Sequence, residues 1–131
     1  MQYFECYAYP DSPVAYPACD KPIPNQQEFF RHLIDLGADM VVGTSAHQPQ
    51  TYELYHGKPI FYGLGNLFFD QIYWLDTRRS LILTHYFDGQ KYLQTRINPT
   101  IYDETLKTSL LNTAETQDFL NRLLQASPKG N

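Results

Sequence analysis

Residues 37–71 organise the rest of this chain, and they read GADMVVGTSAHQPQTYELYHGKPIFYGLGNLFFDQ. The Met-Val-Val run at 40–42 is short and apolar, which predicts a strand buried on both faces of an α/β sheet. Residues 43–50 leave that strand as a polar loop. Because ligand sites of open α/β sheets lie at the carboxyl ends of strands, this loop is the first place to look for a function.

A hairpin and a turn follow the loop. Residues 51–55 and 58–62 are two β-type runs separated by His56-Gly57, and glycine at the second turn position favours a two-residue hairpin. The Gly-Leu-Gly-Asn sequence at 63–66 predicts another turn, because glycine and asparagine tolerate left-handed backbone. The apolar residues 67–69 are then expected to return to the core.

An amphipathic helix is expected immediately before this stretch. Asn25 is a suitable N-cap, Glu28 completes a capping box, and Gly37 ends the helix. The predicted apolar face comprises Phe29, Phe30, Leu33, Ile34 and Leu36. Further upstream, residues 2–9 predict a short strand, and the five prolines within residues 10–24 predict an irregular loop.

The remainder of the chain predicts supporting elements. They are a surface excursion at 71–79, antiparallel strands at 80–87 and 91–97 joined by a turn at Asp88-Gly89, an ambiguous stretch at 98–112 and a helix at 114–126. Asn112 or Thr113 is expected to cap the helix. Its predicted apolar face comprises Phe119, Leu120, Leu123 and Leu124.

The composition is that of one globular domain over residues 1–131, with 43% hydrophobic and 18% charged residues. A net charge of -4 without any basic run argues against nucleic-acid binding. No apolar run approaches the roughly 20 residues that span a bilayer, and the N-terminal MQYFECYAYP has no signal-peptide features. The two cysteines, Cys6 and Cys19, lack zinc-site spacing and are either free thiols or one bridge.

His47 is the leading candidate for chemistry. It follows a predicted buried strand, in a loop whose other polar residues are Thr44, Ser45, Gln48 and Gln50. Neutral imidazole is the commonest metal ligand and a natural acid or base at neutral pH. A lone histidine is usually not a ligand, so the spacing alone does not establish a site.

Other candidates are weaker. Glu5 lies in the aromatic-rich strand, where its carboxylate faces a site, pairs with an arginine or points to water. Asn66 is expected to be a structural turn residue by default. The remaining histidines, on a helix surface, in a turn and in a strand, are His32, His56 and His85. The chain has no nucleophile elbow, P-loop or dinucleotide fingerprint.

Residues 37–71 resemble the C-terminal part of bacterial capsule-synthesis proteins of the CapA type, the poly-γ-glutamate capsule family. The matching residues are LIDLGADMVVG at 33–43, the His-x-x-Gln of His47 to Gln50, and GKPIFYGLGNLFFDQ at 57–71. The Phe-Glu-Cys-Tyr segment at 4–7 looks like the family's Trp-Gly-x-Glu-Tyr region in degraded form, which places Glu5 on its glutamate.

The resemblance implies a fold and a chemistry. The implied fold is α/β (α+β), the C-terminal part of a metallophosphatase-like two-sheet αββα sandwich with a mixed sheet and two main helices. The implied chemistry is that of a metallophosphoesterase holding divalent Mn, Fe or Zn in the complete domain, with His47 at the metal and catalytic centre and Glu5 beside it. Residues expected to shape the site or contact the substrate are Ser45, Gln48, Gln50 and Asn66.

The resemblance is incomplete at the metal ligands. The family's Asp-x-His, Gly-Asp and Asn-His motifs have no counterpart here. In its Gly-x-His-x-His loop, Gly43 and His47 match, but Ser45 stands in place of the first histidine, and a hydroxyl is a poorer ligand for transition metals. Two-metal hydrolysis needs ions roughly 3.5–4 Å apart, which one histidine and one carboxylate cannot hold. Catalysis by this chain alone is therefore not expected.

Three hypotheses follow. The first is a portion of a CapA-like, metallophosphoesterase-like protein that acts in synthesis or export of a cell-envelope polymer, which implies an extracytoplasmic parent whose address lies outside this chain. The second is a non-catalytic module that binds an anionic polymer or a protein without metal. The third is a small hydrolase completed by a second copy of the chain, because exposed sheet edges and an exposed apolar face favour self-association. A missing N-terminal half is the other expected partner, and the expected substrate is an anionic polymer or a phosphoester.

Overall fold

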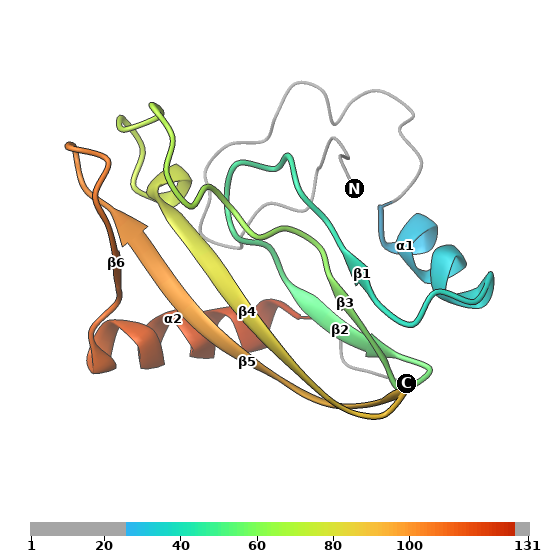
Figure 1. Ribbon diagram of the computed structural model, residues 1–131. Helices are drawn as coiled ribbons and strands as arrows, with labels where there is room; N and C mark the ends of the chain where they lie inside the picture. The colour runs from blue at the N-terminus through green and yellow to red at the C-terminus, as the bar shows by residue number, and fades with distance from the viewer. Residues whose placement is uncertain (1–25, 128–131) are drawn as a thin grey trace.

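The computed structural model describes residues 26–127 as two three-stranded sheets and two α-helices (Figure 1). The helix α1 lies beside the first sheet, and α2 runs across the second. The expected mixed α/β class is confirmed. The predicted strand at 2–9, the proline-containing loop at 10–24 and the cap at Asn25 lie outside the described residues.

The helix α1 (Gln26–Asp35) forms where helical spacing predicts it. Phe30 and Ile34, four residues apart, are buried on one face. Gly37 has a φ of 109°, its N–H donates to Ile34 O (2.9 Å), and the next N–H donates to Leu33 O (3.0 Å), which is a Schellman ending. Leu36 was expected on the apolar face but is 71% exposed, because it follows the last helical residue and lies off the Phe30–Ile34 stripe.

The first sheet has the order β1-β3-β2 and is mixed, as expected. The strand β1 (Val41–Val42) runs parallel to β3 (Lys58–Phe61), whereas β2 (Tyr52–Tyr55) is antiparallel to it. Tyr55 pairs with Lys58, which leaves His56 and Gly57 as a two-residue loop with φ angles of 51° and 75°. Both angles are left-handed, as primed hairpin turns require, so the predicted hairpin is confirmed.

The second sheet is antiparallel with the order β4-β5-β6. Its strands are β4 (Arg79–Asp88), β5 (Lys91–Tyr102) and β6 (Thr108–Leu110). Asp88 pairs with Lys91, so the turn consists of Gly89 and Gln90, one residue beyond the prediction. The ambiguous stretch 98–112 contains the end of β5 and the whole of β6.

The helix α2 (Thr113–Ala126) is capped by Asn112, which forms a capping box with Glu115. It buries Phe119 and Leu123 against Leu81 of β4. Leu124 was expected on this face but is exposed, because it lies one residue, or about 100°, round the helix from Leu123.

The two sheets meet through the glycine-rich turn after β3. Leu81 N–H of β4 donates to Leu64 O (2.8 Å), and Gly65 forms an antiparallel bridge with Ser80. The chain then leaves the core instead of returning to it. Leu67, Phe68 and Phe69 are exposed, which corrects the expectation that they enter the core. They begin a long loop that closes at the short 3₁₀ helix η2 (Asp76–Arg78).

Candidate functional site

The parallel pairing of β1 with β3 brings two segments of the chain to one edge of the first sheet. Parallel strands end at the same edge, and Gly43 N–H, just past β1, donates to Phe61 O at the end of β3 (2.7 Å). Residues 43–50 therefore leave the sheet beside residues 62–66. This is the carboxyl edge at which ligand sites of α/β sheets form.

The glycines at 63 and 65 allow these segments to touch. A Cβ at Gly63 would overlap the Gln50 side chain, and a Cβ at Gly65 would overlap Arg79 O. Gly65 also has a φ of 77°, which favours glycine. With no side chains in the way, Gln50 N–H donates to Gly63 O (2.9 Å), and Pro49 pairs with Leu64.

His47 and Asn66 meet at the end of this contact. Nδ1 of His47 lies 3.0 Å from Oδ1 of Asn66, and Nδ2 of Asn66 donates to Thr77 O (3.0 Å). The Phe69 ring lies against the imidazole, with the two ring centroids 5.3 Å apart. The structure thus brings together two of the residues named from sequence, His47 and Asn66.

The backbone around His47 is strained. Ser45 has a φ of 89° and His47 a φ of 57°, both in the left-handed region that non-glycine residues rarely adopt. Such residues cluster at functional sites, where the surrounding structure holds them in place. The loop 43–50 is therefore built to present His47 in one fixed geometry.

The other residues named from sequence are spread around this pair. Ser45 of the loop 43–50 is half-buried, whereas Gln48 and Gln50 of the same loop are buried. Glu5 lies outside the described residues. His32 and His56 are exposed, and His85 is half-buried on β4, where its Nδ1 lies 2.7 Å from Thr95 Oγ1.

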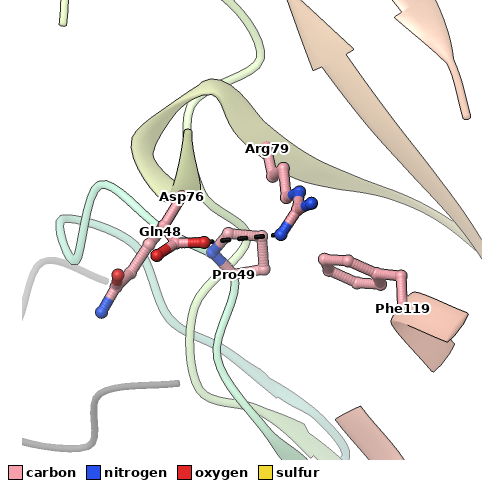
Figure 2. A pocket seen from close by; sticks show the side chains of 5 residues that line it. All are labelled: Gln48, Pro49, Asp76, Arg79 and Phe119. Atoms are coloured by element: carbon pink, nitrogen blue, oxygen red, sulfur yellow. Dashed lines mark hydrogen bonds and ion pairs between the residues drawn. The ribbon is translucent and has the colours of Figure 1, made fainter. Parts of the chain in front are cut away.

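Gln48 and Pro49 line a crevice with η2 and α2 (Figure 2). Asp76 pairs with Arg79 (3.4 Å), whose guanidinium lies over the Phe119 ring, 6.0 Å from its centroid. The space between these walls does not admit a water-sized molecule. The crevice is a packing junction that supports the loop 43–50, and we assign it no ligand.

Sequence reasoning missed the residues that hold Asn66 in place. The buried Thr77 donates through Oγ1 to the carbonyls of Gln71 and Trp74 (2.9 Å each). The fully buried Tyr102 donates its O–H to Thr77 O (3.0 Å). Thr77 was hidden in a predicted surface excursion and Tyr102 in an ambiguous stretch, so no local signal marked either residue.

A buried ion pair beneath the sheet was also missed. Arg31 of α1 donates from Nε and Nη2 to Glu53 of β2 (2.9 and 2.6 Å), and Tyr62 O–H donates to the same carboxylate. Burial raises the pKa of Glu53, but the hydrogen bonds from Arg31 and Tyr62 outweigh it, and the net pKa is lowered. Fully satisfied in this way, Glu53 ties α1 to the sheet.

The described residues do not fit a two-metal centre. Within residues 26–127, His, Cys, Asp and Glu side chains form no group of three or more that could hold a metal ion. His47 offers one imidazole, and Ser45 next to it offers a hydroxyl, which transition metals bind poorly. We therefore derive no metal-dependent step from this part of the chain.

Comparison with known proteins links the stretch around His47 to capsule synthesis. Residues 17–71 match the family described as bacterial capsule synthesis protein PGA_cap. Similar proteins are a capsule biosynthesis protein CapA of Bacillus anthracis (37% identical over 67 residues), a PGA biosynthesis protein CapA of Bacillus subtilis (40% over 65) and a probable polyglutamine synthesis accessory protein of Mycobacterium tuberculosis (50% over 44).

These matches cover about a third to a half of this chain but little of the relatives. They span 51%, 50% and 34% of the chain, in the same order, but only 16%, 17% and 12% of the three relatives. No helix within residues 26–127 is long and apolar enough to cross a membrane.

Proposed function

We propose that the chain acts in synthesis or export of an anionic cell-envelope polymer, on the premise that residues 17–71 match the bacterial capsule synthesis family that the sequence resembles. Poly-γ-glutamate is the polymer that the family resemblance suggests. The proposed place of action is the cell envelope. Support comes from the relatives named for capsule and PGA biosynthesis.

We further propose that the chain forms the C-terminal part of a metallophosphoesterase-like sandwich. Two sheets, each with one helix packed on it, are consistent with such an architecture. The observation that carries the site is the pair His47–Asn66 at the carboxyl edge of β1 and β3, in a strained loop. In this proposal His47 is a metal-site residue that needs further ligands from outside residues 26–127, with Glu5 as its neighbour.

Metal content tests this role of His47. The chain is loaded with Mn²⁺, Fe²⁺ or Zn²⁺, desalted and analysed, alongside His47→Ala and the matched control His56→Ala, which removes an exposed imidazole. We expect retention near one ion per chain in the wild type and in His56→Ala, and loss in His47→Ala. No retention by the wild type contradicts a metal site completed within this chain, and equal loss in both variants contradicts the role of His47.

A second candidate function is a binding module without metal chemistry. Ser45 at the position of the family's first histidine, together with the absence of a ligand cluster within residues 26–127, favours it. Such a module should bind poly-γ-glutamate equally well with and without a chelator. Ser45→His separates the two candidates, because it should raise metal retention only if the rest of a metal site is present.

A further inference from the structure

We propose that Asn66 is a positioning residue that fixes His47 in the Nδ1–H tautomer and leaves the lone pair of Nε2 for a ligand. The inference rests on the proposed function only in treating His47 as a residue that meets a ligand. The tautomer itself follows from the contacts of Asn66 and is measurable on the chain without metal or substrate.

The orientation of the Asn66 amide follows from its second partner. Thr77 O is a carbonyl and can only accept a hydrogen bond, so the group 3.0 Å from it must be the amide NH₂. Gln71 Oε1, another acceptor, lies on the same side at 3.5 Å. The amide oxygen therefore faces His47. Because Oδ1 is only an acceptor, Nδ1 of His47, 3.0 Å away, must carry the proton.

The hydrogen bonds around Thr77 oppose a flip of the Asn66 amide. Thr77 O also accepts from the Tyr102 hydroxyl, and the Thr77 side chain is bonded to the carbonyls of Gln71 and Trp74. Flipping Asn66 would place two carbonyl oxygens against each other in a half-buried position, with no proton between them. The fixed carbonyl of Thr77 thus sets the amide of Asn66, which in turn sets the tautomer of His47.

This tautomer determines what His47 can meet. A free neutral histidine favours the Nε2–H form, so the site reverses the ordinary preference. Within residues 26–127, the only hydrogen bond of the imidazole is the one from Nδ1 to Asn66. The unprotonated Nε2 then accepts either a metal ion or a hydrogen-bond donor, and it repels the lone pair of an acceptor. The ligand atom at His47 is thus electron-poor, whether or not a metal is involved.

Nitrogen-15 spectra of the imidazole side chains test the proposal in alkaline buffer, where histidine is neutral. The chain has four histidines, and exposed His32 on α1 is the internal reference for an unconstrained ring. We expect the Nδ1–H pattern for His47 in the wild type and the ordinary Nε2–H pattern for His32. Asn66→Leu should return His47 to the pattern of His32, while the signals of His85 stay unchanged.

Asn66→Asp keeps the acceptor for Nδ1–H but loses the donor to Thr77 O, so we expect it to be less stable than the wild type and, where it folds, to retain the Nδ1–H pattern. The wild-type spectrum decides the outcome if neither variant folds. An Nε2–H pattern in the wild type overturns the proposal, as does an Nδ1–H pattern in folded Asn66→Leu or its loss in folded Asn66→Asp. Metal retention is measured separately, so a chain with the Nδ1–H form but no metal refutes only the proposed metal role.

Discussion

The imidazole Nδ1 of His47 lies 3.0 Å from the amide oxygen of Asn66, although 19 residues separate the two in the sequence. The cause is the parallel pairing of β1 with β3, which sends both following loops to one edge. In an antiparallel pair the same two loops would leave from opposite ends. The block at 57–71 thus supplies β3, Gly63, Gly65 and Asn66, all of which serve the position of His47.

Gly65 should therefore be more sensitive to substitution than its backbone angle alone predicts. Gly57 and Gly65 have almost the same φ, 75° and 77°, but a Cβ at Gly57 meets open space, whereas one at Gly65 would overlap Arg79 O. We expect Gly57→Ala to lower the free energy of unfolding by about 1–2 kcal/mol, the cost of a left-handed alanine. Gly65→Ala should cost more. Urea unfolding measures both.

The imidazole spectrum of His47 shows whether these two substitutions also disturb the site. Gly57→Ala lies at the far hairpin and should leave the His47 imidazole spectrum unchanged, whereas Gly65→Ala should disturb it. Equal stability losses with identical spectra would show that residues 63–66 adapt freely, which contradicts the tight contact described above.

Local signals in the sequence were sufficient for most elements, and non-local contacts explain the errors. The His56-Gly57 hairpin and the helix cap at Asn112 are confirmed because each depends on a few neighbouring residues. Residues 67–69 were wrongly expected in the core because an apolar run carries no information on what covers it. Thr77 and Tyr102 act on Asn66 from 11 and 36 residues away, and no pattern in the chain signals such contacts.

Strand β2 shows another case in which local sequence does not predict burial. Glu53 is 2% exposed and Leu54 is 51% exposed, the opposite of what their polarity predicts. The partner that makes this arrangement stable, Arg31, comes from α1 and lies 22 residues away in the sequence. Hydrophobic alternation cannot anticipate a buried carboxylate whose compensation comes from another element.

Glu53→Gln should reveal the strength of this buried pair. The amide keeps the size of the side chain but loses the charge that Arg31 and Tyr62 satisfy, so we expect the free energy of unfolding to fall by about 2–4 kcal/mol. Asp39→Asn is the matched control, because Asp39 pairs with Lys58 (3.1 Å) at an 85% exposed side chain. It should change stability little. Similar losses in both variants would contradict the burial of the Glu53 pair.

The same pair predicts a pH dependence of stability. The pKa of Glu53 is lowered in the folded chain, so the folded state favours the carboxylate and gains stability above the ordinary Glu pKa of 4.5. This gain is lost as pH falls from 4.5 through the folded-state pKa. Urea midpoints of the wild type and Glu53→Gln should therefore differ most at neutral pH and converge in acid. A constant difference down to strong acid would contradict the lowered pKa.

The loop at 67–75 should make the chain self-associate. It exposes six large hydrophobic residues within nine positions, and Phe68 and Trp74 are 64% and 63% exposed. Exposed apolar side chains concentrated in one loop are typical of an interface, and burying one such ring contributes about 1.5–3 kcal/mol. We expect the sedimentation coefficient of the wild type to rise with protein concentration. The double variant Phe68→Ser/Trp74→Ser should weaken association at least tenfold.

The control variant Leu36→Ser, which removes an exposed leucine outside this loop, should behave like the wild type. A wild-type chain that sediments as a monomer at all concentrations would show that this loop does not drive self-association.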